Sequence, residues 1–253
     1  MRPISLLLSL LYPPVCPVCG EILTKAVAAV ENPYICSSCY GKISFPAEPR
    51  CLNCSRPVFD EREELCPDCK KKKKRRFDQS VSLMLHDEVS KKILYDLKYY
   101  NRKDNARMLA FEAAQREGWR MQMWGIDVII PVPLHKKRQI SRGYNQAQVL
   151  AEQFVRNLDL MQSGREPAID VDSGFLVRVR QTKAQKELSG EQRRANIREA
   201  FTVRYREPPD KYAGKTILLI DDIYTSGATL SECAGVLKRH GARRVYCLTF
   251  AIG

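Results

Sequence analysis

The stretch from residue 217 to residue 230 constrains the fold more than any other part of the chain. It reads ILLIDDIYTSGATL. Residues 217–220 are continuously apolar and lie between segments with helical patterns, which predicts a parallel strand covered on both faces. Asp221 and Asp222 follow at the expected carboxyl end of this strand. The predicted fold class is therefore α/β.

The two adjacent carboxylates should act separately. Side chains alternate in direction along a strand, so Asp221 and Asp222 cannot share one proton as a catalytic dyad does. We expect them to accept hydrogen bonds from hydroxyl groups of a ligand, or to lie near a hydrated magnesium ion.

Small residues follow the acids and open a helix. The small residues are Thr225, Ser226, Gly227, Ala228 and Thr229. They let backbone N–H groups approach a ligand, and the positive end of the following helix favours a phosphate. Two acids followed by a phosphate-binding turn suit a phosphorylated sugar. The stretch has neither the Walker pattern nor the GxGxxG dinucleotide pattern. An ordinary strand–turn–helix is the alternative.

Four CxxC pairs near the amino terminus predict two zinc sites, since two such pairs complete a tetrahedral site of four cysteines. The candidate ligands are Cys16, Cys19, Cys36, Cys39, Cys51, Cys54, Cys66 and Cys69. The simplest assignment is sequential, with the first four on one zinc and the last four on the other, and spacing alone leaves an interleaved arrangement open. Redox sites or an iron–sulfur cluster are alternatives. Structural zinc is favoured because the segment is too small for its own core.

Charge and hydropathy limit the partners. The net charge is +13, which suits polyanionic ligands, whether pyrophosphate or nucleic acid. The seven cations of residues 70–76 predict an exposed connector, with contact to nucleic-acid phosphates as the sharper alternative. No stretch is long enough for a membrane span. Residues 4–11 predict a first helix docked on the body rather than a signal peptide, and metal-bound thiols favour a reducing cytoplasm.

A second apolar run predicts another strand of the same sheet. Residues 126–132 lead into Pro133 and then into three cations, Lys136, Lys137 and Arg138, which could face an anion. Residues 81–85 predict a further strand, and residues 89–100 and 107–117 predict helices. The polar segment 176–201 is a candidate lid.

The whole chain resembles the ComF family of competence-associated proteins. The resemblance rests on LYPPVCPVCG, the four CxxC pairs, RGYNQA, an R-x-T-x-x-Q-x-x-L segment and IDDIYTSGAT, in that order. It implies a double zinc-ribbon module in residues 1–76 and, in residues 77–253, a type I phosphoribosyltransferase-like parallel sheet flanked by helices.

The resemblance also implies a ligand. In type I phosphoribosyltransferases the two acids bind the ribose hydroxyls of phosphoribosyl pyrophosphate, and the TSGAT segment holds its 5′-phosphate. The loop after the first core strand binds pyrophosphate, which corresponds here to Lys136, Lys137 and Arg138. The implied cofactors are two structural Zn²⁺ ions and Mg²⁺ carried with phosphoribosyl pyrophosphate.

Two functions are open at this stage. The first is a phosphoribosyltransferase linked to DNA uptake in natural competence, with Asp221 and Asp222 as catalytic residues. The second is a non-catalytic protein that binds single-stranded DNA, or a protein of the competence machinery, and uses the phosphoribosyl site as a sensor. Little sequence after residue 250 is left for a base-selective hood, which disfavours nucleobase salvage.

Overall fold

The computed structural model describes residues 13–71, 75–161, 169–180 and 197–253. Its centre is a sheet in which every neighbouring pair of strands is parallel, as predicted. The strand order is β1 (Gln79–Leu85), β7 (Arg244–Ile252), β6 (Thr216–Tyr224), β2 (Val128–Pro131) and β3 (Asp170–Val171). The strand that carries the two acids is therefore internal, and neighbours on both sides fix its position.

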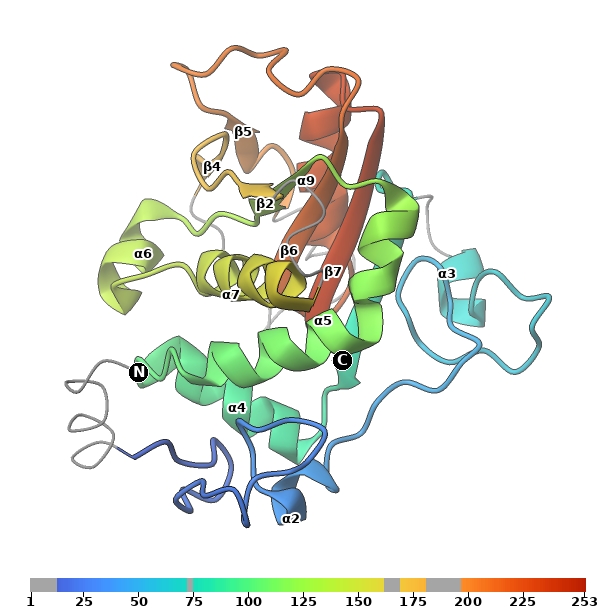
Figure 1. Ribbon diagram of the computed structural model, residues 1–253. Helices are drawn as coiled ribbons and strands as arrows, with labels where there is room; N and C mark the ends of the chain where they lie inside the picture. Colours follow the sequence, from blue (N-terminus) through green and yellow to red (C-terminus); the bar gives the residue numbers. More distant parts are fainter. Residues whose placement is uncertain (1–12, 72–74, 162–168, 181–196) are drawn as a thin grey trace.

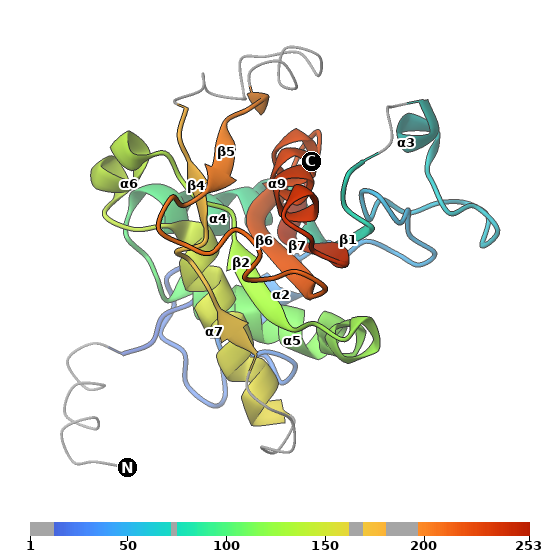
Figure 2. The ribbon, with the colours of Figure 1, turned by 90° about the horizontal axis from the view of Figure 1, so that it is seen from above.

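Helices cover both faces of this sheet (Figures 1 and 2). The longer ones are α4 (Glu88–Tyr99), α5 (Asn105–Trp124), α7 (Gln146–Met161) and α9 (Ala228–Arg239), and the shorter ones are α2 (Ser37–Tyr40), α3 (Pro67–Lys71) and α6 (Lys136–Arg142). Leu218 and Ile220 of β6 join the apolar cluster that contains residues of α5 and α7, whereas Ile217 and Leu219 join the cluster that contains residues of α9. Alternate residues of β6 thus face opposite layers.

Helix ends follow local signals. Asp87 caps α4, because its side chain accepts a hydrogen bond from the Ser90 N–H. Gly125 ends α5 in the left-handed region, at φ 59°. The helix α5 is longer at both ends than the predicted span of 107–117. The apolar pattern hides this length, because the buried face of α5 includes two glutamates, Glu112 and Glu117.

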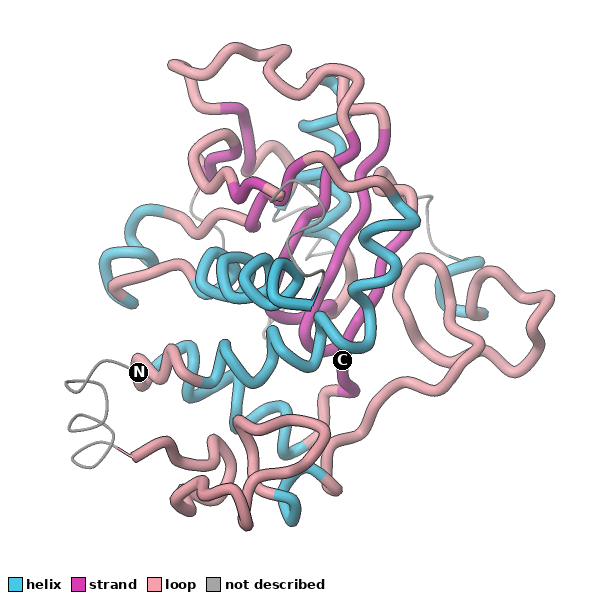
Figure 3. Tube along the Cα trace, viewed as in Figure 1, coloured by secondary structure: helices cyan, strands magenta, loops and turns pink. Residues whose placement is uncertain are grey.

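The cysteine-rich segment covers the open edge of the sheet. Strand β1 pairs with β7 on one side only. On the other side, the Ser80 N–H donates to the Leu52 carbonyl and the Leu85 N–H to the Ser44 carbonyl, both at 2.8 Å. This segment is mostly loop (Figure 3). It nevertheless satisfies backbone groups of an edge strand that would otherwise be free to pair with another chain.

The buried glutamates of α5 attach the cysteine-rich segment to the helical layer. Glu112 accepts hydrogen bonds from Asn32 Nδ2 and from the Tyr40 hydroxyl, each at 3.0 Å. Glu117, further along the same helix, forms a salt bridge of 2.8 Å with Arg50. The two carboxylates therefore hold the regions before and after residue 45 on one helix.

Three sequence predictions need separate comment. The ends of the predicted lid form an antiparallel pair, β4 (Leu176–Arg178) with β5 (Phe201–Val203), and residues 181–196 lie outside the described residues. The predicted first helix, at residues 4–11, also lies outside them. Across the described ranges, no helix has both the length and the apolar character that a bilayer crossing requires.

Candidate phosphosugar site and zinc sites

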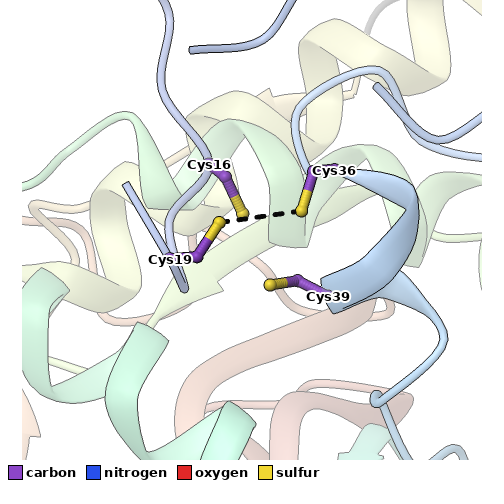
Figure 4. A group of neighbouring side chains, drawn as sticks. All are labelled: Cys16, Cys19, Cys36 and Cys39. Carbon is purple, nitrogen blue, oxygen red and sulfur yellow. Dashed lines mark hydrogen bonds between the residues drawn. The ribbon is translucent and has the colours of Figure 1, made fainter. Parts of the chain in front are cut away.

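Eight cysteines gather into two groups of four, Cys16, Cys19, Cys36 and Cys39 in one and Cys51, Cys54, Cys66 and Cys69 in the other. Within each group all sulfur atoms lie within 4.8 Å of one another. In the first group the side chains point toward a common centre (Figure 4). The sequential assignment is confirmed, and the interleaved one is wrong.

The sulfur spacing fits zinc. Cys19 and Cys36 Sγ are 3.7 Å apart, and Cys54 and Cys66 Sγ are 3.6 Å apart. Four sulfurs at about 2.3 Å from a tetrahedral zinc are separated by about 3.8 Å, close to both distances. Each group is a closed set of four thiolate ligands, so the metal would have no open position and a structural role follows.

Strand β6 continues further than the apolar run indicates. Its pairing with β7 extends to Tyr224, opposite Ile252, so both acids lie inside the strand rather than after it. The predicted end at residue 220 is wrong because a polar residue does not stop a strand whose neighbour still offers ladder partners. The acids are consequently held by the sheet on a fixed backbone.

The two carboxylates face different layers, as alternation along the strand predicts. Asp222 Oδ2 lies 2.7 Å from Lys98 Nζ of α4. Asp221 Oδ1 accepts a hydrogen bond of 2.9 Å from the Asp222 N–H, and the charge of Arg178 in β4 acts on it. Lys98 and Arg178 are site residues that the sequence did not reveal. Neither lies in a recognisable motif, and only the fold brings each to an acid.

The surroundings hold Asp221 close to its titration point at neutral pH. Burial raises the pKa of Asp221 to about 7, and the charge of Asp222 adds to the increase. The Asp222 N–H, Lys98 and Arg178 lower the pKa by smaller amounts. A hydroxyl-rich ligand or a cation that binds the ionised carboxylate would displace the proton.

The turn after β6 requires glycine. Gly227 adopts φ 68° as the N-cap of α9, and a Cβ there would lie 2.3 Å from the Tyr224 hydroxyl oxygen. The turn therefore lies directly against the Tyr224 ring. Ser226 is buried, and its hydroxyl accepts a weak hydrogen bond of 3.4 Å from the Ala228 N–H. The α9 amino terminus thus begins shortly after both acids, where its N–H groups and dipole favour an anion.

The second cysteine group lies near this turn. Among the causes that raise the pKa of Tyr224, after burial, are the charges of Cys69 and Cys54. Cys54, Cys69 and Tyr224 also belong to one buried cluster. Tyr224 is therefore close enough to the second cysteine group for its charges to act on the hydroxyl, while its ring lies against the Gly227 turn.

The predicted pyrophosphate loop is a helix. Residues after Pro133 form α6, with His135 as N-cap: its side chain accepts a hydrogen bond from the Lys137 N–H. Lys136 and Lys137 are exposed, whereas Arg138 is half-buried and its charge lowers the pKa of Arg178 after the larger effect of burial. Of the three predicted cations, Arg138 is therefore the one electrostatically linked to the acids, through Arg178.

Residues 144 and 145 serve the fold. The Tyr144 hydroxyl donates to the Leu97 carbonyl, and Asn145 Nδ2 donates to the Val132 carbonyl at 3.0 Å. Both side chains are buried.

Magnesium fits this site only together with a ligand. Among the described residues, the cysteine groups alone bring three or more potential metal-binding side chains together. Asp221 and Asp222 point to different layers, and Lys98 pairs with one of them. Carboxylate oxygens suit Mg²⁺, which commonly binds one or two carboxylates together with substrate phosphates.

Comparisons with known proteins find a known domain in each half of the chain. Residues 7–70 match the double zinc ribbon domain, and residues 141–252 match the phosphoribosyl transferase domain. Competence protein F of Haemophilus influenzae is 29% identical over 214 residues, covering 83% of this chain and 87% of its own length.

Two further relatives cover similar shares. DNA utilization protein YhgH of Salmonella typhi is 28% identical over 85% of this chain and 96% of its own length. Competence protein ComFC of Bacillus subtilis is 27% identical over 82% of this chain and 79% of its own length. The chain therefore carries a double zinc ribbon and a phosphoribosyltransferase domain, and it is similar along most of its length to these competence and DNA utilization proteins.

Proposed function

We propose that the carboxyl end of β6 and the amino terminus of α9 bind phosphoribosyl pyrophosphate with Mg²⁺. One observation carries the proposal: two acids on β6 are followed directly by the Gly227 turn and then by the amino terminus of α9. The helix N–H groups and the Gly227 turn suit the 5′-phosphate. Asp221 and Asp222 suit the ribose hydroxyls.

Each acid would exchange its present partner for the ligand. Lys98 holds Asp222 in the free protein. A ribose hydroxyl that donates to Asp222 releases the lysine, whose charge can then face the pyrophosphate or the metal. Lys98 would therefore neutralise the acid in the absence of ligand and the phosphates in its presence.

Cations near Asp221 suit the pyrophosphate leaving group. Arg138 and Arg178 lie close enough for each to affect the other electrostatically, and two neighbouring guanidinium groups offer donors to a pyrophosphate. Lys136 and Lys137, exposed on α6, can add to the local positive field. When bound, Mg²⁺ would supply charge stabilisation for the departing pyrophosphate.

In the reaction, C1 of the ribose would form a bond to an acceptor while its bond to the pyrophosphate oxygen breaks, and pyrophosphate would leave. The positive charge that develops on the sugar ring favours nearby carboxylates. In a reducing cytoplasm, this activity would be linked to DNA uptake, because the relatives are named for competence and DNA utilization.

Pyrophosphate release tests this function. The zinc-loaded protein is mixed with Mg²⁺ and labelled phosphoribosyl pyrophosphate, with water as the acceptor at C1, and release is compared with that of Asp221→Asn. We expect release that the substitution abolishes. Equal release by both proteins would show that turnover does not use this site, and tight binding without release would favour a non-catalytic role.

A second candidate function is a binding protein whose phosphoribosyl site acts as a sensor. It is favoured by the free-state arrangement, in which Lys98 already satisfies Asp222 and the raised pKa leaves Asp221 partly protonated. Its output would be affinity for single-stranded DNA or for a protein of the competence machinery. The net charge of +13 predicts DNA affinity that falls steeply with salt. Binding that is absent or insensitive to salt would exclude the nucleic-acid part.

A further inference from the structure

Three tyrosines at the end of α4 form an exposed aromatic surface. The exposed fractions of Tyr95, Tyr99 and Tyr100 are 49%, 54% and 65%. Their rings nevertheless contact one another: the Tyr95 ring centroid lies 4.7 Å from that of Tyr99 and 5.8 Å from that of Tyr100. Large aromatic side chains that cluster in solvent are not explained by packing of the core. We call these three residues the tyrosine platform.

Positive charge lies beside the tyrosine platform. The Arg142 guanidinium lies 5.1 Å from the Tyr99 ring centroid and within reach of its hydroxyl. Lys91, Arg102 and Lys103 are exposed nearby in sequence. In the part of the chain that the structure describes, none of these three forms a salt bridge with an acid. Of the acids in this region, Asp96 and Asp104 already pair with Lys92 and Arg107, whereas Glu88 is exposed and forms no salt bridge among the described residues.

Exposed aromatic faces beside cations match one class of ligand. Unpaired bases stack on aromatic side chains while cations contact the phosphates that join them, and stacking tolerates any sequence. Duplex DNA does not offer its base faces, because they are stacked inside the helix. A protein partner could cover the tyrosines as well, but four cations near the tyrosine platform against one exposed, unpaired acid, Glu88, favour a polyanion.

The tyrosine platform is connected to the candidate phosphosugar site by its own helix. Lys98, between Tyr95 and Tyr99 in sequence, forms the salt bridge with Asp222. Movement of Lys98 on ligand binding would therefore occur within one turn of the stacking rings. The site and the tyrosine platform share one rigid element.

We propose that the tyrosine platform stacks the bases of single-stranded nucleic acid, with Arg142, Lys91, Arg102 and Lys103 contacting the phosphates. The proposal deepens the second candidate function and rests on it, because it assigns a surface and a mode of contact to the nucleic-acid partner. Phosphoribosyl pyrophosphate binding does not depend on it.

The test measures binding of a fluorescent oligothymidylate by anisotropy, with the full zinc-loaded chain at low salt. One variant carries Tyr95→Ala, Tyr99→Ala and Tyr100→Ala together. A second carries phenylalanine at the same three positions and keeps the ring faces. The control is Tyr205→Ala, which removes a fully exposed tyrosine outside the tyrosine platform. Thermal unfolding and calorimetry with phosphoribosyl pyrophosphate check that each variant is folded and that its other site is intact.

We expect the triple alanine variant to bind at least about tenfold more weakly, since stacking contributes about 1–3 kcal/mol per base. The phenylalanine variant and Tyr205→Ala should bind as the original chain does. A second oligonucleotide, with abasic central positions, keeps the phosphates and loses the bases. It should bind the original chain weakly, and the alanine substitutions should weaken it no further.

Four results would overturn the proposal. Equal affinity of the alanine variant and the original chain for oligothymidylate would exclude the tyrosine platform but leave DNA binding in place. An equal loss for the abasic oligonucleotide would show that the rings do not act through bases. No DNA binding by the original chain would exclude both the tyrosine platform as a binding surface and the nucleic-acid function. Loss of self-association in the alanine variant, without a change in DNA binding, would assign this face to a second copy of the chain.

Discussion

The two cysteine groups have the same chemistry and the same CxxC pattern, but they are attached differently. Both regions are held on α5 by one buried glutamate, Glu112 for the first and Glu117 for the second. Only the second group is associated with Tyr224, under the Gly227 turn. We infer that the first ribbon anchors the fold, whereas the second ribbon also supports the candidate phosphate cradle.

Removing one ligand from each group gives the largest expected effects. Cys39→Ser and Cys51→Ser both replace buried cysteines, one in each group. Each variant should lose one zinc and unfold its ribbon, because structural zinc contributes about 10–16 kcal/mol to such modules. Metal analysis and circular dichroism measure this loss.

Ligand affinity should separate the two cysteine variants. Cys51→Ser should weaken phosphoribosyl pyrophosphate binding, since Tyr224 loses its support, while Cys39→Ser should retain it. Equal affinities in a calorimetric titration would contradict the difference between the ribbons that we infer.

The glutamates of α5 should differ in their contribution to stability. Glu117 pairs with Arg50 and Arg120, whose side chains are only 11% and 13% exposed. Glu117→Gln leaves both guanidinium groups with the more exposed Glu48 as their remaining carboxylate among the described residues, and it should lower the free energy of unfolding by about 3 kcal/mol. Glu112 contacts Arg116, whose side chain is 40% exposed, and two neutral donors. Glu112→Gln should therefore lower the free energy of unfolding by about 1–3 kcal/mol.

Chemical denaturation of the two glutamine variants compares these free energies. Asp104→Asn, at an exposed salt bridge, is the control and should change the free energy by less than about 1 kcal/mol. A larger loss for Glu112→Gln than for Glu117→Gln would reverse the order we assign to the two attachments.

The turn beside the second ribbon can be tested with two glycines. Gly227 and Gly143 both adopt positive φ, 68° and 77°, but a Cβ would collide with Tyr224 only at Gly227. Backbone strain should cost each alanine variant about 1–3 kcal/mol of stability. Gly227→Ala should in addition abolish ligand binding in a calorimetric titration. Parallel losses of affinity in both variants would mean that the Gly227 turn has no special role.

The pH dependence of binding is the smallest expected effect. The pKa of Asp221 is raised from its usual value of 3.8 to about 7. Its ionised form is therefore scarce at pH 6 and predominant at pH 8, so affinity for a ligand that binds the carboxylate should rise about tenfold between these values. Asp221→Asn should keep only the dependence that comes from the phosphate ester itself. An unchanged pH profile in that variant would exclude Asp221 as the titrating group.

The sequence predicted those parts of the fold that are encoded locally. Cysteine spacing predicted both metal groups, and apolar runs with turn residues predicted β6, its turn and α9. It could not predict the contacts of Lys98 and Arg178, because each depends on the packing of a distant element against β6. The helix α6 was missed because the prolines before it indicated a loop. Pro133 in fact precedes the helix, which begins at Lys136.

The most direct test of the candidate site is a calorimetric titration of the zinc-loaded protein with phosphoribosyl pyrophosphate, with and without Mg²⁺. Our account predicts one saturable site per chain, strengthened by Mg²⁺ and lost in both Asp222→Asn and Gly227→Ala. No heat of binding in either condition, or undiminished binding in both variants, would contradict the assignment of this strand and turn to a phosphorylated pentose.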